Sequence, residues 1–259
     1  MLPVLQVGPL AVQLPGLLLL LGFWLASMLV GRSAKRHGLD GEVLDRLLLL
    51  AMVAGVIGAR LGFALQHASA FADDVRAILS FNLTAFAPVE GAAAGVLAAL
   101  IYGQRKSLPL WPTLDALAPG AALFAVFFHL SQLASGDGFG APTNLPWAIE
   151  LWGERRHPAQ LYALAASLAI LLMVLWLEKR QEFPGELALS WLALGSGARL
   201  VLEAFRGDSL YLAGVRQAQL AALMLLMLSL AGLHLLARRR GGGDAAGAAA
   251  GEAEGAGPG

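Results

Sequence analysis

The chain of 259 residues contains no cysteine and few charged residues. Without cysteine it can form no disulfide framework and has no thiol nucleophile of its own, so any thiol chemistry must use a thiol of the substrate. Charged residues make up 14% of the chain, whereas soluble domains carry about 25%. Hydrophobic residues make up 58%. This composition predicts an integral membrane protein.

Several motifs are absent as well. The sequence has no GxxxxGK[ST] phosphate loop, no Cys/His spacing typical of metal sites and no basic-aromatic stripe for nucleic acid. These absences exclude P-loop nucleotide hydrolysis, a metal centre and a nucleic-acid partner. Residues 1–14 have neither a basic n-region nor a small-residue cleavage site, so we expect no removable signal peptide.

Long apolar runs of about 17–25 residues, the length that crosses a bilayer, recur along the chain. Seven candidate spans cover residues 14–31, 43–66, 86–103, 113–134, 157–178, 186–205 and 216–237. Arginine and lysine follow the first, third, fifth and seventh spans, whereas the other loops hold many acids. By the positive-inside rule, the sequence predicts an all-α integral membrane protein, a seven-transmembrane-helix bundle with its N-terminus outside and its C-terminus cytoplasmic.

We expect one folded domain over residues 1–240. Within it, residues 67–85 are too polar to span and form an outer arm segment. Residues 241–259 contain mostly glycine and alanine with a few acids, and so offer too little bulky apolar surface to fold. They are predicted to form a disordered cytoplasmic tail.

Two arginines, Arg60 and Arg199, lie inside otherwise apolar stretches. A cation at membrane depth is costly and usually faces the bundle interior or a wet cavity. Two such cations predict an anionic ligand held within the membrane.

Arg199, Glu203 and Arg206 stand at i, i+4 and i+7, which places them on one helical face. One interpretation is an internal ion pair that fixes two helices. The other is a phosphate clamp, because guanidinium groups bind phosphate oxygens in a bidentate manner. The sequence leaves both open.

Other polar residues stand near the ends of the apolar runs. His129, Gln132 and Asp137 cluster near the outer end of the fourth span, which suggests a wet site. A membrane histidine can be a packing residue or a base, and both roles stay open for His129. Glu90, in the third span, needs a partner or must be protonated.

Four segments carry a family resemblance. They are GAPTNLPW at 140–147, RHPAQLY at 156–162, GARLG at 58–62 and RLVLEAFR at 199–206. In order and spacing, from about residue 10 to 237, the chain resembles the bacterial prolipoprotein diacylglyceryl transferases.

The resemblance implies seven transmembrane helices, an outer active site and a multi-pass protein of the bacterial cytoplasmic (inner) membrane. It implies phosphatidylglycerol as lipid donor and, as acceptor, the lipobox cysteine of a secreted prolipoprotein, with glycerol phosphate leaving. It implies no metal or organic cofactor. It also implies that membrane lipid surrounds the protein and is one of its partners.

The resemblance and the residue chemistry together give an expected site. The expected catalytic residues are His129, Glu90 and Arg199, and the expected phosphatidylglycerol-binding residues are Arg60, His129, Gln132, Arg199 and Arg206. The expected structural supports are Asp137, Gly140, His157, Gln160 and Glu203.

The chain departs from the family pattern in its reactive centre. Glu90 stands where the family has a histidine, His129 where it has its lipid-binding arginine, and Gln132 where it has asparagine. Asp137 replaces a glutamate, and Leu19 and Gly195 stand near the places of two missing tyrosines.

Three functions therefore remain open. The first is an active, divergent transferase, and the second is a phospholipid-binding paralogue that is inactive or uses another acceptor. The third is a small-molecule transporter, although the internal repeats expected of one are not seen. An intramembrane serine protease would need a serine and a histidine that contact each other. Ser131 and His129 cannot form such a pair on one helix, because side chains two residues apart do not face each other.

Overall fold

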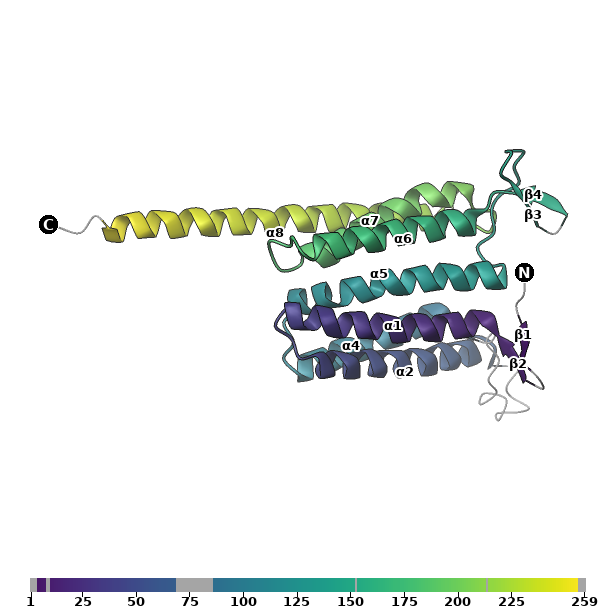
Figure 1. Cartoon of the computed structure of the whole chain (residues 1–259), viewed down its shortest axis with the longest axis horizontal. Coiled ribbons are helices and arrows are strands. Elements are labelled where there is room, and N and C mark those ends of the chain that lie inside the picture. The colour runs from purple at the N-terminus through teal and green to yellow at the C-terminus, as the bar shows by residue number, and fades with distance from the viewer. Residues whose placement is uncertain (1–3, 8–9, 69–85, 152, 213, 256–259) are drawn as a thin grey trace. The chain divides into compact units, whose positions relative to one another are not determined.

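A computed structural model of the chain describes residues 4–7, 10–68, 86–151, 153–212 and 214–255. Most of these residues are helical (Figure 1). Internal contacts divide the chain into two compact units, one formed by Ser27–Thr113 and the other by Met1–Ala26 with Leu114–Gly259. Residues 69–85 of the expected outer arm lie outside the described residues.

The described elements follow the predicted spans closely. The helices are α1 (Leu14–Arg36), α2 (Gly41–Gln66), α4 (Pro88–Arg105), α5 (Leu110–Ser135), α6 (Ala159–Leu177), α7 (Glu186–Leu202) and α8 (Gln217–Gly255), and the 3-10 turn η2 (Glu203–Phe205) continues α7. Antiparallel hairpins pair β1 (Val4–Val7) with β2 (Leu10–Gln13), β3 (Ile149–Leu151) with β4 (Glu154–Arg156), and β5 (Tyr211–Leu212) with β6 (Val215–Arg216).

Within the described residues, six helices are long and apolar enough to cross a membrane, namely α1, α2, α5, α6, α7 with η2, and α8. Large side chains on them are exposed, among them Leu65 at 79%, Leu172 at 61% and Leu228 at 70%. Such apolar exposure suits contact with lipid. Helix α4 forms where a span was predicted but does not belong to this set, since its 18 residues carry Glu90 near one end and Arg105 at the other. The predicted membrane-helical class is thus confirmed, whereas the count of seven spans stays a prediction.

Helix α8 runs beyond the expected end of the folded part. We expected residues 241–259 to lack structure, but the backbone remains helical to Gly255. The expectation rested on the absence of bulky apolar side chains. Helix formation depends also on local propensity, and alanine, abundant in this segment, has the highest helix propensity of all residues.

In the unit Ser27–Thr113, α2 and α4 pack closely through small residues. A Cβ at Gly91 would come within 2.7 Å of the Ala59 Cβ, and one at Gly58 within 2.3 Å of the Ala94 Cβ. Only glycine permits this approach. Small residues at such positions are the usual means of helix association in membranes, where no hydrophobic force drives helices together.

In the other unit, α6, α7 and α8 lie side by side (Figure 1). A buried carboxylate, Asp115 on α5, fixes the start of α7. Its oxygens accept hydrogen bonds from the backbone N–H groups of Gly185 (2.5 Å) and Ala188 (2.9 Å) and from the Gln181 side-chain amide (2.7 Å). These contacts satisfy N–H groups that have no partner within the helix, and they place a negative charge at its positive end.

The loop after α5 connects the N-terminal end of α6 with the C-terminal end of α7. Backbone N–H groups donate from Ala141 to the Phe205 carbonyl and from Gly207 to the Phe139 carbonyl, both at 2.9 Å. The His157 N–H, just before α6, donates to the Ala141 carbonyl at 3.0 Å. The loop therefore holds the beginning of α6 next to the end of α7.

Candidate active site

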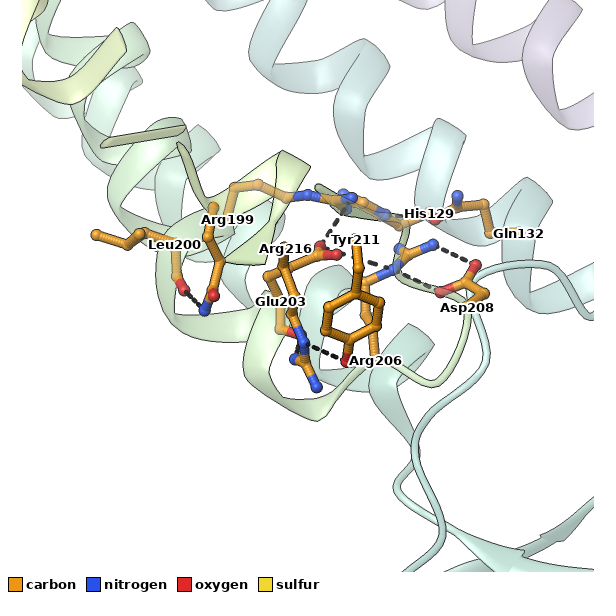
Figure 2. Close-up of polar contacts among 10 residues, drawn as sticks. His129, Gln132, Arg199, Leu200, Glu203, Arg206, Asp208, Tyr211 and Arg216 are labelled. Carbon is orange, nitrogen blue, oxygen red and sulfur yellow. Dashed lines mark hydrogen bonds and ion pairs between the residues drawn. The ribbon is translucent and has the colours of Figure 1, made fainter. Parts of the chain in front are cut away.

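The end of α7 carries a buried carboxylate between two arginines (Figure 2). Glu203 is 1% exposed. Its Oε2 lies 2.9 Å from Arg199 Nη2 and 3.9 Å from Arg206 Nε. Helix α7 ends at Leu202, so Arg206 stands beyond the helix on extended backbone rather than on the regular helical face that the spacing predicted. The expected ion pair is therefore present, but both partners belong to α7 and its continuation η2, so it does not join two helices as one interpretation expected.

The two arginines differ in what else they bind. Arg206 is 13% exposed, and its Nε and Nη2 bind the two carboxylate oxygens of Asp208 at 2.9 and 2.6 Å. Arg199 is 42% exposed and, among the carboxylates of the described residues, forms an ion pair with Glu203 alone. Arg199 therefore has more donor capacity for a ligand, whereas the bidentate edge of Arg206 is already engaged.

A third arginine, Arg216 at the end of the β5–β6 hairpin, closes the cluster. Its Nη1 donates to the backbone carbonyl of Glu203, and its Nε donates to the Tyr211 hydroxyl at 3.1 Å. A cation at a helix carboxyl end stabilises the unpaired carbonyls there. The cluster thus holds three guanidinium groups against the two carboxylates of Glu203 and Asp208, which leaves one positive charge in excess.

His129, on α5, lies at the same end of the unit. Its Nδ1 is 3.0 Å from the Gln132 Oε1. A Cβ placed on Gly138 would lie 3.3 Å from that oxygen and 3.1 Å from Arg206 Nη1, so Gln132 and Arg206 approach each other around this glycine. Gly138 has a φ of +70°, which suits glycine at this crowded turn.

A cavity of about 480 Å³ begins at these residues and continues between α5, α6, α7 and α8. His129, Arg199 and Arg206 are the charged or titratable residues of its lining, and alanines make up nine of the twenty lining residues. The lining serines do not change its apolar character, because Ser167 donates to the Leu164 carbonyl and Ser196 to the Leu192 carbonyl. A cationic end on an apolar cavity suits an amphiphile with an anionic head.

The predicted supporting residues form the frame around this site. A Cβ at Gly140 would meet the His157 carbonyl oxygen, so the loop can pass here only as glycine. The His157 ring packs edge-on against Phe205, with centroids 5.2 Å apart. Gln160, in the first turn of α6, is 1% exposed. Asp137 accepts a hydrogen bond from the Ser135 hydroxyl at 2.7 Å.

The remaining two predicted residues belong to the unit Ser27–Thr113. Arg60 is 9% exposed, and its guanidinium carbon lies 5.8 Å from the centre of the Phe86 ring. Glu90 accepts a hydrogen bond from the Gln66 amide at 2.5 Å, so it has a polar partner, as the sequence predicted that it would need. His129, Gln132, Arg199, Glu203 and Arg206 are the predicted residues that the structure brings together within one unit.

The cluster is completed by three residues that the sequence did not mark as members of the site: Asp208, Tyr211 and Arg216. Asp208 and Arg216 were visible only as charges of a mixed loop. Their partners depend on the turn after η2 and on the β5–β6 hairpin, which no periodic pattern marks. The Arg-x-Asp spacing of Arg206 and Asp208 is the one local signal that could have suggested the pair.

The fold and the site define a polytopic membrane protein that presents arginines at the end of an apolar cavity. The chain belongs to the prolipoprotein diacylglyceryl transferase family, whose family model matches residues 3–235.

Similar proteins include three that carry the name phosphatidylglycerol–prolipoprotein diacylglyceryl transferase. That of Trichormus variabilis is 31% identical over 251 residues, with 91% of this chain and 89% of the relative covered. That of Thermus thermophilus is 30% identical, with 93% and 98% covered. That of Clostridioides difficile is 28% identical, with 81% and 84% covered.

Proposed function

We propose that this protein transfers the diacylglyceryl group of phosphatidylglycerol to the lipobox cysteine thiol of secreted prolipoproteins. The observation that carries the proposal is the pair of guanidinium groups, those of Arg199 and Arg206, that line one end of an apolar cavity. A phosphodiester carries one negative charge and is attached to acyl chains, so phosphatidylglycerol matches the site in both charge and polarity. Family membership over most of the chain supports the same substrate.

The reaction joins the substrate sulfur to the glyceryl carbon that bears the phosphate. The carbon–oxygen bond to phosphate breaks, its electron pair stays on the phosphate oxygen, and glycerol phosphate leaves. The thiol proton ends on a base or on the leaving group. No thiol of the enzyme is required, which agrees with the absence of cysteine.

Arg199 is the proposed phosphate-binding residue. Negative charge grows on the leaving phosphate in the transition state, and a guanidinium already oriented by Glu203 stabilises that charge without reorganisation. Arg206 and Gln132 support the same end of the cavity. Arg60, in the unit Ser27–Thr113, is proposed as a further phosphatidylglycerol-binding residue.

His129 is the proposed base. The Gln132 amide oxygen accepts a hydrogen bond from the His129 Nδ1–H, which leaves the lone pair of Nε2 for a proton. Its place on the cavity wall lets it meet a thiol that approaches the lipid head. Glu90 is the second candidate for proton transfer.

The proposal includes the setting of the enzyme. Seven spans, with α4 as the third, place the N-terminus outside and the C-terminus in the cytoplasm, as the loop charges favour. The site then lies at the outer face of the bacterial inner membrane, where secreted prolipoproteins and phosphatidylglycerol meet.

The proposal is tested with purified protein, phosphatidylglycerol labelled in its acyl chains and a lipobox peptide. The wild type is expected to label the peptide thiol, and Arg199→Ala to reduce kcat by about a hundredfold or more, as loss of a transition-state charge partner does. Arg199→Lys keeps the positive charge but lacks the planar guanidinium group, so its kcat is expected to lie between those of the wild type and Arg199→Ala. Arg46→Ala is the matched control, because Arg46 is exposed, pairs with Glu42 and does not line the cavity.

The outcome also separates the second candidate function. If the protein binds phosphatidylglycerol but does not label the peptide thiol, it is a lipid-binding paralogue. The replacement of family residues at Glu90 and His129 is the observation that favours this candidate.

A further inference from the structure

The cavity is lined mainly by small residues, nine of them alanines. On three helices, however, the lining residue farthest from the arginines is large. These are Ile170 on α6, Trp191 on α7 and Leu225 on α8.

The direction of each helix shows that these three side chains all lie toward the end of the cavity that is opposite the arginines. His157, just before α6, contacts Phe205, just after α7, so the two helices run in opposite directions from a common end. The Gln219 side chain donates to the Leu200 carbonyl at 3.2 Å, which places the start of α8 at that end as well. Ile170, Trp191 and Leu225 are therefore the residues deepest from the arginines on their helices.

The depth of the cavity suits an extended hydrocarbon chain. Trp191 lies eight residues before Arg199, a rise of about 12 Å along an α-helix. Ile170 lies eleven residues after Ala159, a rise of about 16 Å on α6.

We propose that Trp191, supported by Ile170 and Leu225, sets the length of the acyl chain that the enzyme accepts. The inference rests on the proposed function: the lipid phosphate lies at Arg199, and one of its two acyl chains enters the cavity until its end meets the Trp191 ring. The second acyl chain remains in the surrounding bilayer.

Shape, rather than hydrophobicity, supplies the selectivity. A lipid chain leaves a bilayer that is as apolar as the cavity, so transfer itself contributes little. A chain that is too long must displace the indole or withdraw its head from Arg199, and close-packed sites resist such crowding. A chain that is too short leaves a void beside the three large side chains, and the atoms lining a void lose their dispersion contacts.

The test compares dilauroyl, dipalmitoyl and diarachidoyl phosphatidylglycerol as donors to a lipobox peptide, with competing pairs in one reaction. Trp191→Ala deepens the cavity and is expected to raise the kcat/KM ratio of the longest over the shortest donor by about tenfold. Ala166→Leu narrows the cavity partway along α6 and is expected to shift the ratio by a similar factor in the opposite direction. Trp176→Ala is the matched control, since Trp176 is 49% exposed on α6 and does not line the cavity.

Native mass spectrometry measures binding of the same three lipids to each variant, so the two proposals fail in different ways. Transfer by the wild type with an unchanged length profile in both variants overturns the role of Trp191 and leaves the transferase function intact. Shifted binding profiles with no transfer by any protein support the role of Trp191 and reject the function. If Trp191→Ala does not fold, Trp191→Leu and Ala166→Leu carry the comparison, and profiles identical to wild type again overturn the proposal.

Discussion

Glu203 is the residue on which the charges of the site depend. Its carboxylate is buried, and the side chains of Arg199 and Arg206 both approach it. Removal of one partner from a buried pair leaves an uncompensated charge, which costs far more than the pair contributes. Glu203 therefore forms an internal ion pair with the arginine that we propose as the phosphate-binding residue. An ion pair and a phosphate clamp are thus compatible at this site.

The proposed base role of His129 gives a prediction at this scale. His129→Asn keeps a polar side chain of similar reach but cannot act as a base. The expected result is a kcat for thiol labelling that falls by about a hundredfold to ten-thousandfold, the usual contribution of general base catalysis. The KM for phosphatidylglycerol and its binding by native mass spectrometry are expected to stay near wild type.

The control is His234→Ala, an exposed histidine of α8 that does not line the cavity. An unchanged kcat with a raised KM in His129→Asn contradicts the base role. It would assign His129 to lipid binding, the role of the family arginine at this position, and would direct attention to Glu90.

Part of this site was predictable because helical periodicity and membrane depth are visible in a sequence. They identified Arg199, Glu203, Arg206 and His129. Asp208 was not predicted as a partner of Arg206, because its position depends on a turn rather than on a helix. The cavity was expected only as a wet, cation-lined space. Its alanine walls arise from four helix faces whose packing no single segment specifies.

At the scale of elements, the packing of α2 on α4 predicts different effects of alanine at two glycines of α4. A Cβ at Gly91 would lie 2.7 Å from the Ala59 Cβ and 2.8 Å from the Gly55 carbonyl oxygen, so Gly91→Ala must separate the helices. The expected loss is about 1–3 kcal/mol of unfolding free energy, typical of overpacking. It is measured as a lower unfolding midpoint in detergent micelles.

Gly103 on the same helix is the matched control, since a Cβ there meets nothing within 4 Å. Gly103→Ala is expected to be neutral or to stabilise by up to about 1 kcal/mol, the difference in helix propensity. Equal midpoints for the two variants would mean that α2 and α4 do not pack in this way.

The elements themselves were largely predictable, since a long apolar run in a membrane protein has few alternatives to a helix. Their ends were less so. Helix α1 continues to Arg36 through charged residues, and α8 continues to Gly255, because helices do not end where apolar character ends. The role of Asp115 was also not predicted. Its partners, Gly185 and Ala188, are about seventy residues away, and only the fold shows that they meet it.

At the scale of the whole molecule, the path of α4 decides the topology. The helix is 18 residues long, close to the minimum for a span, and Glu90 and Arg105 lie near its two ends, where charged side chains reach the interface. If α4 crosses, the loop of Lys106 lies in the cytoplasm and the loop of Asn144 lies outside. If α4 does not cross, both loops change sides.

The absence of cysteine makes this directly measurable, since any introduced cysteine is the only one. Lys106→Cys and Asn144→Cys are exposed sites in the two loops, and Glu42→Cys is an exposed site in the first turn of α2. In intact spheroplasts treated with a membrane-impermeant maleimide, we expect labelling of Asn144→Cys and protection of the other two. Labelling of Lys106→Cys alone would show that α4 does not cross. Labelling of both Glu42→Cys and Lys106→Cys, with Asn144→Cys protected, would show that the bundle is inverted, which would place Arg199 at the cytoplasmic face and remove the proposed site from its secreted substrate.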